Sequence, residues 1–195
     1  MSLPEKKQRY TYADYCTWDG DERWELFDGE AYALAAPLIV HQRIIGNLHL
    51  QFATFLKDKP CEVFIAPVDV LLNAAGDNDD DVVQPDLVVV CDHAKITEKY
   101  INGAPDAVIE VLSPSTSTRD KFLKFNKYQN TGVREYWIVD PDSKTVQVHI
   151  LETGRYFTKS YGETGKISVH VLEGCEISLS DVFSELAFTD RRAAL

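Results

Sequence analysis

The fold is decided by a nearly continuous apolar stretch, Ala107-Val108-Ile109-Glu110-Val111-Leu112, and by an earlier one, Leu87-Val88-Val89-Val90-Cys91. Apolar runs without polar alternation are typical of strands that are covered on both faces. We therefore expect two buried strands at the centre of a sheet. Composition and turn signals predict further strands over residues 23–27, 30–34, 61–66, 68–72, 135–139, 145–151, 155–161 and 167–172.

Two substantial helices are predicted between these strands. Apolar residues recur at helical spacing from Leu38 to Leu56, and Pro60 follows. A second helix over about 119–130 ends at Gly132, and short helices are expected over 11–17 and 180–186. The order predicts an α/β (α+β) protein with a central mixed β-sheet flanked by helices, plus additional antiparallel strands. No repeat or linker divides the chain, so we expect a single domain, 1–195, with its core at about 12–183.

The charge balance restricts the possible partners. The chain has 195 residues and a net charge of -11, with a pI near 4.8. This counts against a general nucleic-acid binder, because phosphate contacts need clustered Lys and Arg. It leaves room for a nuclease whose carboxylates attract phosphate through a bound metal. The chain carries neither a signal-peptide pattern nor a bilayer-spanning apolar run. We expect a cytoplasmic protein with no membrane partner.

Four cysteines, Cys16, Cys61, Cys91 and Cys175, are scattered without CxxC spacing. This spacing argues against a zinc ribbon or a redox motif. In a reducing compartment the simplest expectation is four buried thiols that act as small hydrophobic side chains.

Two carboxylates lie in or beside the apolar strands. Asp86 follows Pro85 at the entry of one strand, and Glu110 interrupts the other. A carboxylate in an apolar strand is costly unless it is paired, hydrogen-bonded or bound to a metal. If the two strands are neighbours, Asp86 and Glu110 together suit Mg²⁺ or Mn²⁺. The alternatives are backbone contacts for Asp86 and, for Glu110, one of the few purely structural roles of a mid-strand acid.

These residues resemble those of the Uma-type family of restriction-endonuclease-like proteins. The resemblance extends over roughly residues 12–183 and is carried by Trp24 to Glu30, His41, Gln84-Pro85-Asp86, Val108 to Thr116, Asp120, Lys124, Tyr128, Gly132-Val133 and Glu135 to Pro141. It implies the PD-(D/E)xK nuclease fold.

The sequence departs from the wider nuclease pattern at the lysine. Two residues after Glu110, where that pattern has lysine, stands Leu112. The resemblance suggests that Lys124, on the following helix, takes this role, with Lys121 as a possible substitute. A lysine near the metal orients or deprotonates the attacking water and offsets charge on the phosphate. The alternative for Lys124 is a solvated lysine on an amphipathic helix.

Three further residues are candidates near the metal. The resemblance points to Glu25 as an additional metal ligand; the alternative is an exposed strand residue before the Asp28-Gly29 turn. Asp69 ranks below Glu25 for the same role. His41 stands at a helix start, where it acts as a base, contacts phosphate or simply satisfies the helix end. The acidic residues 77–81 lack the glycine and closing acid of a calcium loop, so we expect a solvated loop.

The leading hypothesis is a metal-dependent endonuclease that hydrolyses phosphodiester bonds in DNA, working as a homodimer. Asp86, Glu110 and Glu25 hold the metal, and Lys124 assists. The alternative is a catalytically inactive module that keeps the nuclease fold and acts in protein or nucleic-acid interaction. An open groove lined by Arg119, Lys121, Lys124 and Lys127 favours the enzyme, and a closed or wholly acidic one favours the module. A serine hydrolase built on Ser113 is disfavoured, because no nucleophile-elbow motif is present.

Overall fold

The computed structural model describes residues 9–20, 22–113 and 120–184. Its largest sheet has six strands in the order β11-β10-β9-β8-β6-β3. These strands are β3 (Glu62–Ile65), β6 (Leu87–Val90), β8 (Ala107–Val111), β9 (Glu135–Asp140), β10 (Thr145–Glu152) and β11 (Arg155–Tyr161). β8 and β9 are parallel and the other pairs are antiparallel, so the sheet is mixed as expected. The two apolar stretches form the adjacent strands β6 and β8.

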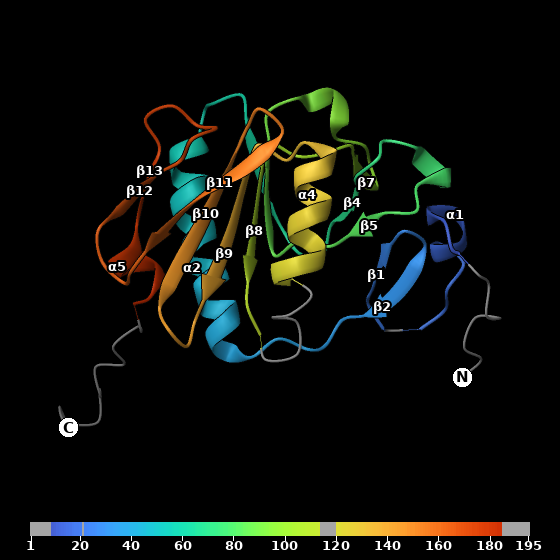
Figure 1. Ribbon diagram of the computed structural model, residues 1–195, viewed down its shortest axis with the longest axis horizontal. Helices are drawn as coiled ribbons and strands as arrows, with labels where there is room; N and C mark the ends of the chain where they lie inside the picture. The colour runs from blue at the N-terminus through green and yellow to red at the C-terminus, as the bar shows by residue number, and fades with distance from the viewer. Residues whose placement is uncertain (1–8, 21, 114–119, 185–195) are drawn as a thin grey trace, which may run out of the picture.

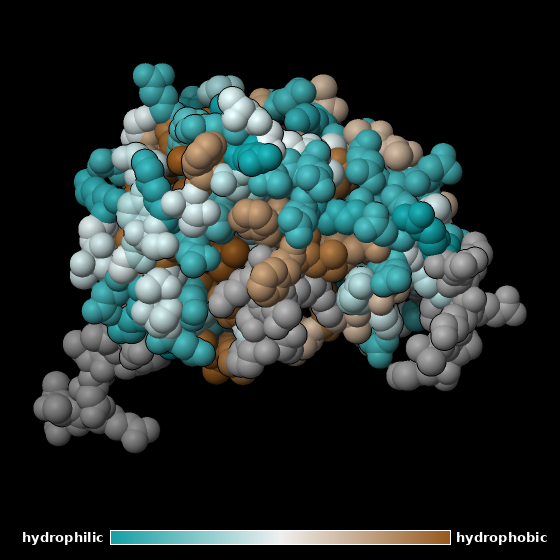
Figure 2. Space-filling model, viewed as in Figure 1, coloured by the Kyte–Doolittle hydropathy of each residue, from teal (hydrophilic) through white to brown (hydrophobic). Residues whose placement is uncertain are grey.

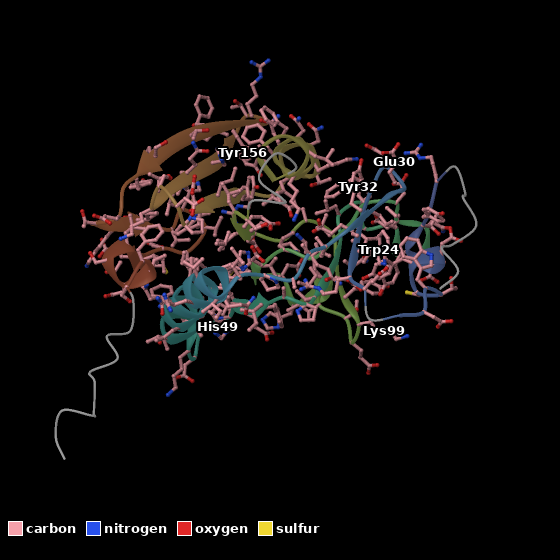
Figure 3. The ribbon with its side chains drawn as sticks, turned by 90° about the horizontal axis from the view of Figure 1, so that it is seen from below. Trp24, Glu30, Tyr32, His49, Lys99 and Tyr156 are labelled. Carbon is pink, nitrogen blue, oxygen red and sulfur yellow. A yellow bond between two sulfur atoms is a disulfide. The ribbon has the colours of Figure 1, made fainter. Side chains whose placement is uncertain are left out.

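Two helices cover opposite faces of this sheet (Figure 1). Helix α2 (Ile39–Leu56) packs on one face, and α4 (Phe125–Thr131) lies on the other. Viewed along the sheet, Tyr156 of β11 lies beside α4, whereas His49 belongs to α2 on the far side (Figure 3). Both predicted helices are therefore confirmed. A π-helical turn, η3 (Asp120–Lys124), leads into α4, and Gly132 ends it with a φ of 92°.

Alternation along the central strands divides the core into two parts. Val89, Ile109 and Trp137 join the cluster on the α2 side. Val88 and Val108 join the cluster on the α4 side, and Glu110 shares their parity in the strand period of two. The carboxylate of Glu110 is therefore directed toward α4.

A second sheet packs on the α4 side of the molecule. Its five strands follow the order β2-β1-β5-β4-β7. They are β1 (Trp24–Phe27), β2 (Glu30–Ala33), β4 (Asp69–Leu71), β5 (Val82–Val83) and β7 (Tyr100–Asn102). The Asp28-Gly29 turn joins β1 to β2 as predicted, and this hairpin carries Trp24, Glu30 and Tyr32 at one end of the molecule (Figure 3).

Several short elements complete the described chain. The predicted helices over 11–17 and 180–186 correspond to α1 (Tyr12–Tyr15) and α5 (Leu179–Val182). The strand expected over 167–172 is only β12 (Lys166–Ser168), which pairs with β13 (Glu176–Ser178). Strands β5, β7 and β13 were not predicted, because runs of two or three residues are too short to show a period. The single-turn helices η1 (Gly76–Asn78) and η2 (His93–Lys95) were also not expected.

The expectation of four buried thiols is wrong for three of the cysteines. Cys61 and Cys91 form a disulfide, because the register of β3 and β6 sets them opposite each other with Cα atoms 4.0 Å apart. Cys16 is exposed, whereas Cys175 is buried as predicted. Burial raises the pKa of the Cys175 thiol to about 11, so this side chain stays neutral.

The acidic residues 77–81 do not form a solvated loop. Asp77 is exposed, but Asp79 is fully buried and Asp81 is 4% exposed. Asp79 accepts hydrogen bonds from the backbone N–H groups of Asn73, Ala75 and Asp81. Carboxylates in a charge run can thus be buried when backbone donors turn toward them.

Figure 2 shows a mainly hydrophilic face, on which apolar side chains gather around the lower end of α4. Within the described parts of the chain, no helix is long and apolar enough to cross a membrane.

Candidate active site

Asp86 and Glu110 come together because β6 and β8 are neighbours. Leu87 pairs with Ile109 and Val88 with Val108, so continuing the register by one residue sets Asp86 opposite Glu110. The Asp86 side chain is 17% exposed and that of Glu110 is 4% exposed. Both line one cleft in the surface. The expected pairing of these two acids is present.

Glu110 is held from the helix that follows its strand. Its Oε1 atom accepts hydrogen bonds from Lys124 Nζ and Tyr128 Oη, each at 2.8 Å. The two donors are four residues apart, so they share one face of the helix. Burial raises the pKa of Tyr128 well above its usual value, and the carboxylates of Glu110 and Glu25 add to this shift. Tyr128 is therefore a neutral hydrogen-bond donor to Glu110.

Lys124 also joins Glu110 to Glu25. Its Nζ atom lies 2.9 Å from Glu25 Oε1, and Glu25 is fully buried on β1. The alternatives of a solvated Lys124 and an exposed Glu25 are both wrong. Gln84 donates its backbone N–H to the same Glu25 oxygen at 3.0 Å, whereas Glu25 Oε2 is buried and has no hydrogen-bond partner among the residues that the structure describes. An unpartnered carboxylate oxygen is costly to bury and is a candidate ligand position.

Asp86 has two partners of its own. Its Oδ2 atom accepts the backbone N–H of Val111 at 2.8 Å and lies 3.1 Å from His41 Nε2. His41 is 8% exposed, on the first turn of α2, and its buried Nδ1 atom has no hydrogen-bond partner within the described parts of the chain. The expected backbone contact of Asp86 exists alongside its place in the cleft. His41 contacts a site carboxylate rather than only satisfying the helix end.

Asp69 belongs to a hydrogen-bond network behind the site. Its Oδ1 atom accepts from Gln84 Nε2 at 2.8 Å and from Tyr15 Oη at 3.1 Å. Gln84 Oε1 in turn accepts from Arg23 Nε at 2.8 Å. Burial and the nearby Asp69 carboxylate raise the pKa of Tyr15 above its usual range. Neither Asp69 nor Glu25 lines the cleft of Asp86 and Glu110, so their relative rank as metal ligands stays a prediction.

The cleft mixes charges of both signs. It encloses about 100 Å³ of free space, several times what one water molecule requires. Its polar lining consists of Arg23, His41, Gln42, Gln84, Asp86, Glu110, Ser113 and Lys124. This lining matches neither the groove of arginine and lysine side chains expected for the enzyme nor the wholly acidic groove expected for the inactive module. Lys127 turns away to Asp28 and Asp81, while Arg119 and the Lys121 side chain lie outside the described residues.

The donor set restricts the kind of metal site. Among the residues that the structure describes, no three His, Cys, Asp or Glu side chains are grouped to hold a metal ion. The predicted third ligand, Glu25, has Lys124 between it and Glu110. Mg²⁺ is commonly bound by one or two carboxylates, with water and phosphate oxygens completing its shell. Asp86 and Glu110 meet this smaller requirement.

Arg23, Gln84 and Tyr15 were not predicted as site residues. Gln84 stands in the motif before Pro85-Asp86, which was the one available signal for it. Arg23 precedes β1, and nothing in its sequence context distinguishes it from a surface arginine. Only the packing of β1 beside β5 brings Arg23 to Gln84.

Comparisons with known proteins support the resemblance. The model of the Uma2 family, described as "Putative restriction endonuclease", matches residues 11–180. The uncharacterized protein slr1290 of Synechocystis sp. is 26% identical over 179 residues, which cover 90% of this chain and 92% of that protein. A crystal structure of a "putative nuclease belonging to DUF820" from Anabaena variabilis aligns with a TM-score of 0.72 at 20% identity. It covers 89% of this chain and 97% of the other, and it confirms the predicted fold class.

Proposed function

Because this chain belongs to the Uma2 family of restriction-endonuclease-like proteins, we propose that it is a metal-dependent endonuclease hydrolysing phosphodiester bonds in DNA. One observation carries the proposal: Asp86 and Glu110 lie opposite each other on adjacent strands and line one cleft, and Lys124 forms a hydrogen-bonded ion pair with Glu110. Carboxylates and a lysine are the groups that such chemistry needs at one point.

Asp86 and Glu110 are the proposed ligands of Mg²⁺ or Mn²⁺. Their carboxylate oxygens are hard donors, and the cleft beside them encloses about 100 Å³, which is room enough for water ligands. When bound, the metal supplies Lewis-acid polarisation of a phosphate oxygen and a more acidic water. The Val111 N–H and His41 Nε2 both contact Asp86 Oδ2, which fixes the direction of this carboxylate. Glu25 remains a predicted ligand through its unpartnered Oε2 atom.

Lys124 and Tyr128 prepare Glu110 and the space beside it. Lys124 donates to Glu25 and Glu110, so its ammonium group is held in one place by two carboxylates. A group already donating to both is better suited to stabilising charge on the phosphate than to accepting a proton. Tyr128 is neutral and directs Glu110 by its hydrogen bond. The displaced lysine of this chain thus reaches the site from a helix instead of from the strand.

The test is hydrolysis of plasmid and single-stranded DNA with Mg²⁺ or Mn²⁺, together with calorimetric titration of Mn²⁺. Glu110→Gln removes a charge and keeps the shape, so we expect DNA hydrolysis to fall about 1,000-fold and Mn²⁺ affinity at least about tenfold. The matched control is Glu135→Gln, the same change on the neighbouring strand and the opposite face of the sheet. Circular dichroism establishes that both variants are folded. Wild-type protein that neither binds Mn²⁺ nor cuts any DNA form contradicts the proposal.

The inactive module remains the second candidate, on a specific observation. Lys124 lies between the two buried glutamates, where it compensates their charge without any metal. In that case Lys124→Met makes the protein depend on a divalent cation for stability, and wild-type protein shows no Mn²⁺ binding. Thermal unfolding of both proteins with and without Mn²⁺ separates the two candidates.

A further inference from the structure

The cleft needs a cation that is not already paired. The chain carries a net charge of -11, and Asp86 and Glu110 add two acids at the point where we place a phosphodiester. Lys124 forms ion pairs with Glu25 and Glu110. Lys127, one helical turn later, forms ion pairs with Asp28 and Asp81. A phosphate that approaches this surface is repelled unless another positive group meets it.

Arg23 has the required position. It is half-buried and lines the same cleft as Asp86 and Glu110. Its Nε atom donates to Gln84 Oε1 at 2.8 Å. Within the described part of the chain, this is its one side-chain hydrogen bond and it forms no ion pair, so both terminal amino groups remain for a ligand.

Gln84 holds the guanidinium in place. The amide nitrogen of Gln84 donates to Asp69 Oδ1 at 2.8 Å and to Tyr15 Oη at 3.0 Å. Because Arg23 can only donate and the Asp69 carboxylate accepts, the orientation of the amide between them is fixed. The backbone N–H of the same residue contacts Glu25, so one residue connects Arg23 to the carboxylates around Lys124.

We propose that Arg23 binds the phosphodiester of the substrate through its two terminal amino groups. The inference rests on the proposed function and adds the recognition of the anion to it. A guanidinium presents a planar pair of donors that matches two phosphate oxygens, whereas an ammonium acts as a point charge. Fixing Nε on Gln84 reduces the conformational entropy lost on binding.

The experiment measures binding of a short fluorescein-labelled DNA duplex by anisotropy, with Ca²⁺ in place of Mg²⁺, over a range of salt. Arg23→Ala is expected to weaken binding about 10- to 100-fold. It should also reduce the slope of log K against log salt by about 0.9, the value for one lost phosphate contact. Arg23→Lys keeps the slope but recovers only part of the affinity.

The matched control is Arg155→Ala, which removes the same charge from an exposed position on the edge strand β11. It is expected to bind like wild type. Equal affinity and slope for Arg23→Ala and Arg155→Ala overturn the inference, and so does a wild-type protein that binds no DNA. A parallel Mg²⁺ assay separates the two proposals. Arg23-dependent binding without hydrolysis rejects only the catalysis, and hydrolysis with an unchanged KM in Arg23→Ala rejects only the role of Arg23.

Discussion

Two lysines three residues apart each connect two carboxylates, with different surroundings. Lys124 Nζ lies 2.9 Å from Glu25 and 2.8 Å from Glu110, and Lys127 Nζ lies 2.7 Å from Asp28 and 2.8 Å from Asp81. Burial lowers the pKa of Lys127, but its hydrogen bonds to Asp28 and Asp81 outweigh this and raise it overall. By distance alone the two clusters are equivalent.

The remaining contacts distinguish the clusters. Asp81 also accepts the backbone N–H of Asp28 at 2.8 Å and the Asn73 side-chain amide at 3.0 Å, so this buried acid has several donors. Around Lys124, in contrast, Glu25 Oε2 is buried with no partner in the described ranges, and Glu110 lines the cleft. Complete hydrogen bonding is typical of a structural cluster, and an unpartnered buried atom beside a cleft is typical of a ligand site.

Of the substitutions that test the difference between the two lysine clusters, replacement of Lys124 is expected to have the largest effect, on the rate of DNA hydrolysis. Lys124→Met removes a charged donor from the proposed phosphate position, so we expect DNA hydrolysis to fall about 100- to 1,000-fold. Single-turnover cleavage rates measure this loss. Because the substitution leaves Glu25 and Glu110 without their shared cation, Lys124→Arg is the second variant if Lys124→Met does not fold. Unchanged cleavage by either variant removes the functional distinction between the two clusters.

Acid pH is expected to have a second, smaller effect, on the stability of the fold. It originates at His149, which belongs to neither lysine cluster. Burial lowers the pKa of His149 from 6.5 to about 4, so between these values the unfolded chain binds a proton that the folded chain does not. The contribution of His149 to the free energy of unfolding is therefore complete above about pH 6.5. It falls by up to about 3 kcal/mol as the pH drops toward 4.

The variant His149→Phe isolates this contribution. Its aromatic neighbours Phe125, Tyr136 and Tyr156 accommodate another ring, although the contact with Thr158 is lost. Urea unfolding from pH 4 to 7 should give a flatter profile than wild type. An identical profile in both proteins shows that His149 does not titrate as stated.

Replacing Lys127 gives the smallest effect. Lys127→Met removes one charged donor from Asp81, which keeps its contacts with Asp28 and Asn73, so stability is expected to fall by about 2 kcal/mol. Mn²⁺ affinity and the cleavage rate should stay within about twofold of wild type. Urea unfolding and the same single-turnover assay measure both quantities. A loss of cleavage comparable to that of Lys124→Met means that the second cluster also belongs to the site.

Buried acids on adjacent strands show where sequence reasoning was too simple. Glu110 was selected because a mid-strand acid has few structural roles, yet Glu135 on β9 is fully buried too. The carboxylate of Glu135 accepts from Trp137 Nε1 at 2.8 Å and from the Val171 N–H at 3.0 Å, and burial raises its pKa. Glu110 lies within an apolar run and Glu135 begins one. Only their hydrogen-bond partners and their face of the sheet distinguish a structural role from a place in the cleft.

The sequence by itself determined the two apolar strands, the helices that flank them and the acids at 86 and 110. These follow from local composition and period, which depend on neighbouring residues in the chain. It also pointed to Lys124, through the family resemblance. Only the tertiary structure decided that Lys124 joins two glutamates, that His41 contacts Asp86 and that Arg23 enters the cleft. These contacts join strands and helices far apart in the sequence, and the hydrogen-bond partners of a buried group depend on how the layers pack.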